Sequence, residues 1–115
     1  MSFDSVTVGL LVRPADAPSL SDAEDAELQD AHLAHLASLH DRGTLLAAGP
    51  FVDQDDPAVR GVTLFGVPPA EARALMDEDP KVRAGVLEMR FATWLVPAGA
   101  VTFGPARFPR STSDV

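Results

Sequence analysis

The chain has 115 residues, of which 46% are hydrophobic and 23% charged. These proportions exclude a disordered or collagen-like chain and favour one globular domain. Seventeen acidic against nine basic residues give a formal net charge of −8, so neither nucleic acid nor an anionic membrane surface is an expected partner.

The first part of the chain predicts a strand followed by a long helix. Residues 6–13 are apolar and partly β-branched, and Pro14 ends this strand. Ser21 and Glu24 have the spacing of a capping box, which marks the start of a helix. The helix is expected to run to about Asp41, because its leucines follow a helical period at positions 28, 33, 36 and 39.

The remaining part of the domain predicts three more strands and a second helix. The strands are expected at residues 44–51, 61–67 and 86–96. The second helix begins at about Pro69, since proline is tolerated in the first helical turn, and reaches about Glu78. Asp79-Pro80 ends it, and residues 81–84 are expected to form one further helical turn.

This order of elements is that of the α+β class with a ferredoxin-like protomer, whose four antiparallel strands carry the helices on one face. No third helix is available for the other face, so we expect a homodimer with two sheets face to face. Residues 1–97 form the predicted domain. Residues 98–115 form a C-terminal extension that is expected to be partly extended or disordered, with a short strand at 101–103.

The expected location is the cytoplasm. The N-terminus carries Asp4 and no basic residue before an apolar run, so it does not resemble a signal peptide. No apolar stretch approaches the roughly 20 residues of a membrane-spanning helix. The chain contains no cysteine, which excludes disulfides, thiolate nucleophiles and cysteine-ligated metal centres.

All three histidines lie on the first predicted helix. Taking about 100° per residue, His32 falls in the middle of the leucine stripe, His35 at its edge, and His40 toward the other side near the helix end. His32 is therefore expected to point at the sheet and His40 to lie near solvent. An inward imidazole has two interpretations: a core histidine with one hydrogen bond, or a general acid or base in a half-buried pocket. His32 and His35 alone provide too few ligands for a metal.

Two further positions near strand ends could serve a site. Asp53 lies in an acidic loop just past a strand that ends in Gly49-Pro50-Phe51. It is either a solvated turn residue or an acid that orients the imidazole. Arg13 ends the first strand and is either solvated or able to hold an anionic substrate group with its forked donors.

Two blocks of the sequence resemble the YciI-like (YCII-related) family, over about residues 6–97. The first block is ungapped, and the second follows the same order and spacing as the family. The first contains His32-Leu33, Leu36, Leu39, Gly43, Leu45, Leu46 and Ala48-Gly49-Pro50. The second contains Glu71-Ala72-Arg73-Ala74-Leu75, Asp79-Pro80, Arg83-Ala84-Gly85-Val86 and Trp94.

The resemblance implies a dimeric α+β barrel built from ferredoxin-like protomers, similar in fold to muconolactone isomerases and small cofactor-free monooxygenases. One branch of the family dehydrochlorinates a chlorinated hydroxyhydroquinone. The family's proposed site pairs a histidine on the first helix with an aspartate near the end of the first strand. The histidine corresponds to His32. Arg13 stands at or beside the aspartate position, which moves the acid to Asp16 or Asp53 or makes the site a histidine and an arginine.

The sequence therefore predicts a cofactor-independent enzyme of lyase, isomerase or hydrolase type that acts on a small-molecule substrate. His32 is the predicted general acid or base, in a pocket between the first helix and the sheet. The alternative is a non-catalytic metabolite-binding or accessory module of the same fold. The predicted catalytic residues are His32, Asp53 and Asp16, and the predicted substrate-binding residues are Arg13, Gly49, Pro50, Phe51 and His35; no metal site is expected.

Overall fold

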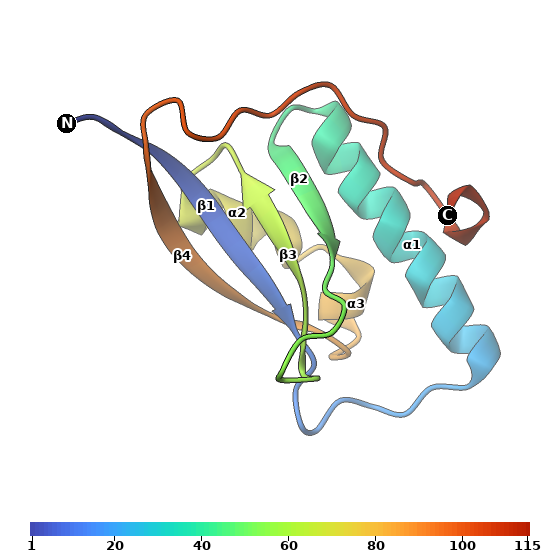
Figure 1. Cartoon of the computed structure of the whole chain (residues 1–115). Coiled ribbons are helices and arrows are strands. Elements are labelled where there is room, and N and C mark those ends of the chain that lie inside the picture. Colours follow the sequence, from blue (N-terminus) through green and yellow to red (C-terminus); the bar gives the residue numbers. More distant parts are fainter.

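The chain folds into a four-stranded antiparallel sheet that carries its helices on one face (Figure 1). The computed structural model describes all residues 1–115. Its elements are β1 (Phe3–Val12), α1 (Asp22–Asp41), β2 (Leu45–Pro50), β3 (Val59–Phe65), α2 (Pro69–Met76), α3 (Pro80–Arg83), β4 (Glu88–Pro97) and the 3₁₀ turn η1 (Thr112–Asp114). The strand order is β2-β3-β1-β4. This topology confirms the predicted ferredoxin-like α+β class.

The element boundaries lie within about three residues of the sequence-based expectation, and two differences have a clear structural cause. β1 begins at Phe3 rather than at residue 6, because it pairs with β4 along its whole length, from Phe3 opposite Pro97 to Val12 opposite Glu88. The prediction of a short strand at residues 101–103 is wrong, since this segment has no regular secondary structure. No helix of the structure has the length and apolar character needed to span a bilayer.

The long helix α1 starts where its capping box predicts. The Ser21 hydroxyl accepts a hydrogen bond from the Glu24 backbone at 3.1 Å, and the Glu24 carboxylate accepts one from the Ser21 backbone at 3.1 Å. The hydrogen bond from the Ser21 backbone is the main cause that lowers the pKa of the Glu24 carboxyl. The inward stripe of α1 includes His32, Leu36 and Leu39, which are buried, so the predicted direction of the His32 side chain is confirmed.

The core lies between the helices and one face of the sheet. Nine buried side chains form it: Leu11, Leu36, Leu39, Leu45, Phe65, Ala72, Met76, Leu87 and Met89. The layer is tight at the centre of β1, where the buried Thr63 hydroxyl donates to the Gly9 carbonyl at 2.8 Å. A methyl group on Gly9 would lie 2.5 Å from the Thr63 oxygen, so only glycine fits this close approach of two strands.

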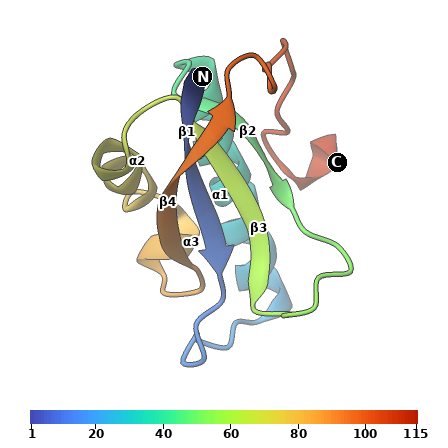
Figure 2. The same cartoon turned by 60° about the vertical axis from the view of Figure 1, so that its left-hand side comes forward.

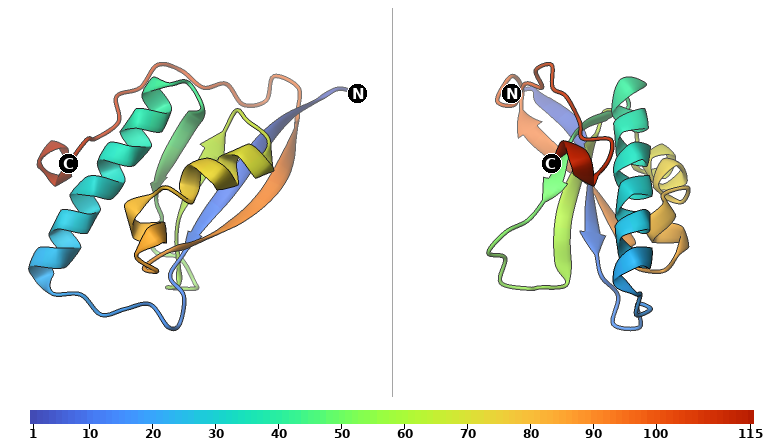
Figure 3. Two further views of the ribbon diagram at one scale, coloured as in Figure 1. Left: turned by 180° about the vertical axis from the view of Figure 1, so that it is seen from behind. Right: turned by 90° about the vertical axis from the view of Figure 1, so that its right-hand side faces the viewer.

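The other face of the sheet carries no helix. Figure 2 shows β1, β3 and β4 in front of α1, and Figure 3 shows the helices together on one side of the sheet. The register places Val8 opposite Leu64 and Leu10 opposite Val62. Because neighbouring residues of a strand point to opposite faces and Leu11 and Phe65 belong to the core, these four side chains lie on the uncovered face. They are only half-buried.

The C-terminal extension crosses from the end of β4 to α1 and then runs beside this helix, which it contacts (Figures 1 and 3). The His40 ring stacks on Phe108 with 4.0 Å between the ring centroids. Arg110 forms an ion pair with Asp41 at 2.9 Å, and the Thr112 backbone and hydroxyl both donate to the Asp30 carboxylate at 2.8 Å. The extension is therefore held along one side of α1 by an aromatic stack and two carboxylates.

Candidate functional site

His32 and Asp79 form a buried pair between α1 and the start of α3. The His32 Nδ1 atom lies 2.8 Å from Asp79 Oδ1 and 3.0 Å from Asp79 Oδ2. Asp79 is 0% exposed and His32 is 7% exposed. A carboxylate can only accept hydrogen bonds, so it places the imidazole proton on Nδ1 and leaves Nε2 with its lone pair.

The position of Asp79 follows from the local sequence. Asp79 precedes Pro80 and caps α3, and Oδ2 accepts hydrogen bonds from the backbone of Lys81 at 3.0 Å and of Val82 at 3.3 Å. Proline suits the first position of a helix and aspartate suits the cap. The same short motif that starts α3 therefore fixes the carboxylate that faces His32.

The second ring nitrogen of His32 is left without a partner in the chain. Nε2 has no hydrogen-bond partner within the chain, yet every buried side-chain nitrogen and oxygen has one. Nε2 is therefore not fully buried, although the rest of the side chain nearly is. An imidazole oriented at Nδ1 by a carboxylate and open at Nε2 can accept a proton from a bound molecule or donate one to it.

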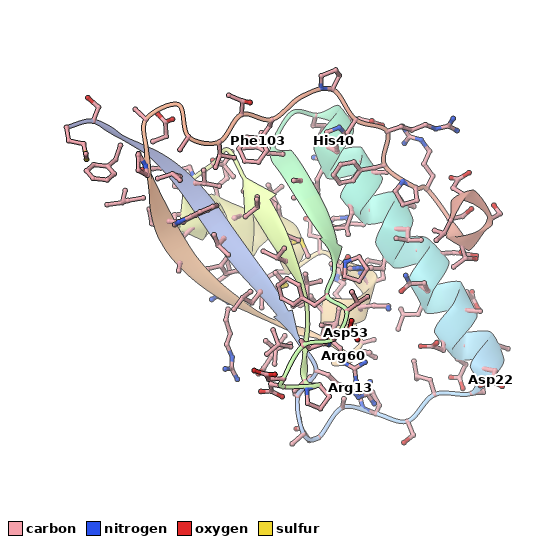
Figure 4. The ribbon with its side chains drawn as sticks, in the orientation of Figure 1. Arg13, Asp22, His40, Asp53, Arg60 and Phe103 are labelled. Atoms are coloured by element: carbon pink, nitrogen blue, oxygen red, sulfur yellow. The ribbon has the colours of Figure 1, made fainter.

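The structure does not place Asp16 or Asp53 on this imidazole. Both side chains are exposed, and neither forms a hydrogen bond with His32. Asp53 lies in the loop between β2 and β3 with φ 59° (Figure 4), and Asp16 lines a cleft of about 460 Å³ together with Arg73. Because Asp79 occupies Nδ1, the orienting role that we assigned to Asp16 or Asp53 is filled by Asp79. Any other role of these two acids in a reaction stays a prediction.

Four of the predicted substrate-binding residues lie at the end of the sheet where β1 and β2 stop, namely Arg13, Gly49, Pro50 and Phe51. Arg13 follows β1, donates weakly to the Pro18 carbonyl at 3.5 Å, and lines a second cleft of about 330 Å³. Gly49, the second-last residue of β2, lies so close to β3 that a side chain on Gly61 would be 2.6 Å from the Gly49 carbonyl oxygen. Pro50 is exposed and Phe51 half-buried. None of these residues forms a hydrogen bond with His32.

The other two histidines bind backbone carbonyls. The His35 Nε2 atom donates to the Leu75 carbonyl of α2 at 3.0 Å. His40 lies 2.8 Å from the Leu45 carbonyl through Nδ1 and 3.2 Å from the Ala106 carbonyl through Nε2. His40 was expected near solvent, but it is half-buried because the C-terminal extension covers it.

Sequence reasoning assigned no role in the site to Asp79 or to Lys81, which lies beside the His32–Asp79 pair. Asp79 was interpreted only as the end of a helix and as part of a family motif. Lys81 is the only lysine of the chain, and it follows Asp79-Pro80 directly. Its ammonium bonds Gln29 of α1, three residues before His32, and its half-burial lowers its pKa. A signal was present, since an aspartate before proline is a helix cap whose second oxygen is free for another partner.

The chain resembles known proteins in sequence and in fold. The family model of the YCII-related domain matches residues 10–93. Protein YciI of Escherichia coli O6:H1 and Protein YciI of Shigella flexneri are each 48% identical to it over 69 residues, which cover 53% of this chain and 69% of each relative.

A solved structure shares the fold at low sequence identity. It is the 5-chloro-2-hydroxyhydroquinone dehydrochlorinase of Burkholderia phenoliruptrix AC1100 in complex with 2,5-dihydroxybenzoquinone. It aligns with a TM-score of 0.52 and 15% identity, over 80% of this chain and 91% of that chain. By the family match and the YciI identity, this chain belongs to the YCII-related domain family.

Proposed function

We propose that this chain is a small-molecule enzyme in which His32 transfers a proton through Nε2 while Asp79 holds the imidazole at Nδ1. The observation that carries the proposal is the pairing of a fully buried carboxylate with an imidazole whose opposite nitrogen is open. A core histidine with a structural role alone needs neither a buried carboxylate nor an open nitrogen. General acid–base catalysis needs a nitrogen that a substrate can reach, and a carboxylate on the other nitrogen fixes the tautomer that leaves a lone pair there.

The proposed chemistry is the removal of a proton from a substrate carbon or hydroxyl by Nε2. The imidazolium that forms is stabilised by Asp79, which remains a carboxylate. The proton then returns to another atom of the substrate, which gives an isomerase reaction, or leaves with a departing group, which gives a lyase reaction. In a hydrolase reaction Nε2 would instead take the proton of a water that attacks the substrate, and would pass it to the departing group. The structural neighbour, a dehydrochlorinase, supports a reaction of this kind on a small ring compound.

We place the substrate at the end of the sheet where β1 stops and β3 begins. The β1–α1 loop lines a cleft there with Arg13, and the β2–β3 loop approaches from the other side (Figure 4). Residues of these two loops would then border the substrate and limit its size. They are the predicted residues Arg13, Asp16, Phe51 and Asp53, with Gly49 and Pro50 at the adjoining end of β2. His35 lies on α1, one turn past His32.

The test uses the ligand chemistry of the neighbour as the first probe. Chloride release from 5-chloro-2-hydroxyhydroquinone is followed for the wild type, His32→Gln and Asp79→Asn, and binding of 2,5-dihydroxybenzoquinone is followed by calorimetry. We expect turnover to fall by about 10²–10⁴-fold in both variants. The control is His40→Gln, which removes an imidazole from the same helix two turns away. Binding of the quinone without turnover in the wild type would instead favour the non-catalytic binding module.

We also infer that two copies of the chain associate through the uncovered sheet face. Val8, Leu10, Val62 and Leu64 line this face, and Trp94 beside them is 42% exposed. Burying such a surface against its own copy is the ordinary way for a sheet to cover a second face. The proposed partner is therefore a second copy of this chain.

Mass measurement by light scattering tests the association. The wild type is expected at twice the 12.1 kDa of the chain, and Leu64→Glu at the single mass, because a carboxylate cannot be buried between two apolar sheets. Leu95→Glu is the matched control, since Leu95 is an exposed leucine whose position in β4 points to the opposite face. A wild type that runs at the single mass, or a Leu64→Glu variant that stays double, contradicts the association.

A further inference from the structure

The only lysine of the chain lies next to the proposed catalytic pair. The Lys81 backbone donates to Asp79 Oδ2, the same oxygen that lies 3.0 Å from His32 Nδ1. Its ammonium bonds the Gln29 carbonyl oxygen. Gln29 and His32 are three residues apart, so they occupy one face of α1. The Lys81 side chain therefore extends along the helix face that carries His32.

The Lys81 ammonium has donors that the chain does not use. An ammonium has three donors, and the one side-chain partner of Lys81 is a neutral amide. The ion pairs of the structure are His32–Asp79, Glu88–Arg90 and Asp41–Arg110, and none involves Lys81. A half-buried cation without a direct ion pair is unusual in a chain with almost twice as many acids as bases.

Two arginines, Arg60 and Arg13, lie on the same side of the molecule as Lys81. Arg60 is close enough to Lys81 to oppose its positive charge, and Arg60 forms no ion pair or side-chain hydrogen bond of its own. The Arg13 backbone donates to the Ala58 carbonyl at 2.8 Å, which places Arg13 where β3 begins, beside Arg60 (Figure 4). Two acids balance part of this charge, since Asp25 and Asp79 both favour the charged form of Lys81. Asp25 also lines the cleft that contains Arg13.

We infer that Lys81 selects the substrate by binding the anionic oxygen of a small carboxylate or phenolate, and so places that molecule beside His32 Nε2. This inference rests on the proposed function, because it assigns the substrate class of the same site. Lys81 and not Arg13 or Arg60 is the central residue, because only Lys81 is bonded beside the pair, to Asp79 through its backbone and to Gln29 of α1 through its ammonium. A neutral molecule of the same shape would leave the ammonium donors without a charged partner and would bind more weakly.

The single lysine allows a direct experiment on the full chain. Protein labelled with ¹⁵N only in its lysine gives one ammonium signal, that of Lys81, which is followed by NMR while benzoate or benzamide is added. We expect a saturable shift of this signal with benzoate and none with benzamide, which has the same ring and no charge. A Lys81 signal that benzoate leaves unmoved would overturn the inference.

Two variants of α3 distinguish the effect of the Lys81 charge from the effect of losing any positive charge on this helix. Lys81→Gln and Arg83→Gln each remove one positive charge from α3, and Arg83 is exposed. Calorimetry should show benzoate binding at least tenfold weaker in Lys81→Gln, unchanged in Arg83→Gln, and retained in Lys81→Arg. Equal binding by Lys81→Gln and the wild type contradicts the inference. The Lys81→Arg variant also guards against misfolding, because a loss caused by misfolding would not be rescued by a second cation.

One further variant distinguishes the failure of this inference from the failure of the proposed function. His32→Gln should still bind benzoate within about twofold of the wild type, because the anion contacts Lys81 and not the imidazole. If His32→Gln turns over as fast as the wild type while benzoate still moves the Lys81 signal, the catalytic proposal fails and the anion site stands. If His32→Gln is inactive and benzoate does not bind, the anion site fails and the catalytic proposal stands.

Discussion

The carboxylate of Asp79 holds the imidazole of His32 from a position 47 residues further along the chain, at 2.8 Å. This contact joins α1 to the first residue before α3, and it makes one aspartate serve two purposes. Its Oδ2 atom closes the cap of α3, and its Oδ1 atom faces the ring. The hydrogen bonds that cap α3 therefore also hold the carboxylate in its position against His32.

Removal of the Asp79 carboxylate is expected to destabilise the fold. In Asp79→Ala the His32 ring and the backbone N–H groups of Lys81 and Val82 lose their acceptor in a fully buried position. An unsatisfied buried polar group costs about 1–3 kcal/mol, so the free energy of unfolding should fall by about 3 kcal/mol in urea titrations. Asp77→Ala, which removes an exposed carboxylate two residues earlier, should change it by less than about 0.5 kcal/mol. Equal effects of the two substitutions would contradict the buried cap.

Gly9 is expected to tolerate no side chain. A methyl group there would lie 2.5 Å from Thr63 Oγ1, 2.8 Å from Phe91 and 2.9 Å from Met89. Overpacking of this kind costs about 1–3 kcal/mol, which thermal or urea unfolding of Gly9→Ala will measure. Gly104→Ala is the control, since no atom lies within 4 Å of the added methyl. A Gly9→Ala variant as stable as the wild type would show that β1 and β3 can separate at little cost.

Docking of the C-terminal extension is expected to weaken in acid. The hydrogen bonds from Thr112 lower the pKa of the Asp30 carboxyl from 3.8, and Arg110 lowers that of Asp41 from 3.8. A lowered pKa in the docked state means that the stabilisation is present above 3.8 and is lost as the pH falls through the lowered values. Backbone amide signals of residues 110–115 should therefore move as the pH is lowered below 3.8.

Substitutions of aspartates in α1 test which carboxyls cause this acid transition. Asp30→Asn combined with Asp41→Asn should remove most of the change, because neither carboxyl can then titrate. Asp22→Asn, on the exposed first turn of the same helix, should leave it in place. Persistence of the transition in the double variant would mean that other groups hold the extension.

Lys81 is expected to make the stability of the protein rise at alkaline pH. Burial lowers the pKa of Lys81 from 10.5, so between that lowered value and 10.5 the unfolded chain binds more protons than the folded one. Stability rises with pH in such a window. Urea unfolding of the wild type and of Lys81→Met at about pH 9 and about pH 10.5 should show a rise that Lys81→Met lacks. The same slope in both proteins would place the Lys81 ammonium in open solvent.

Local patterns accounted for most of the fold. The capping box at Ser21 and Glu24, the leucine period and the prolines predicted the helices, and the helical position of His32 predicted its direction correctly. These features depend on neighbours within a few residues. Local patterns could not predict where β1 begins, because Phe3 becomes part of the strand only by pairing with Pro97.

The partner of His32 could not be found from local patterns, because it depends on how α1 packs against the α2–α3 connection. Asp53 looked suitable because it follows a strand, but its loop leaves it exposed. Asp79 looked like a helix stop, which it also is. His40 was misplaced for a related reason, since the residues that cover it, Ala106 and Phe108, lie in a segment with no periodic pattern.

Asp79→Asn offers the sharpest change of the site. In the wild type, Oδ2 accepts from two backbone N–H groups and Oδ1 faces His32 Nδ1. In the variant the carbonyl oxygen must stay on the backbone donors, so the amide NH₂ faces the ring and Nδ1 must accept. The proton of the neutral imidazole then moves to Nε2, which can no longer act as a base.

The most direct measurement is therefore ¹⁵N NMR of the His32 ring in the wild type and in Asp79→Asn, at about pH 9 where a free imidazole is neutral. The account predicts that the wild-type ring carries its proton on Nδ1 with Nε2 unprotonated, and that the variant carries it on Nε2. A wild-type ring protonated on Nε2, or the same protonated nitrogen in both proteins, would contradict the claim that Asp79 orients His32 for proton transfer.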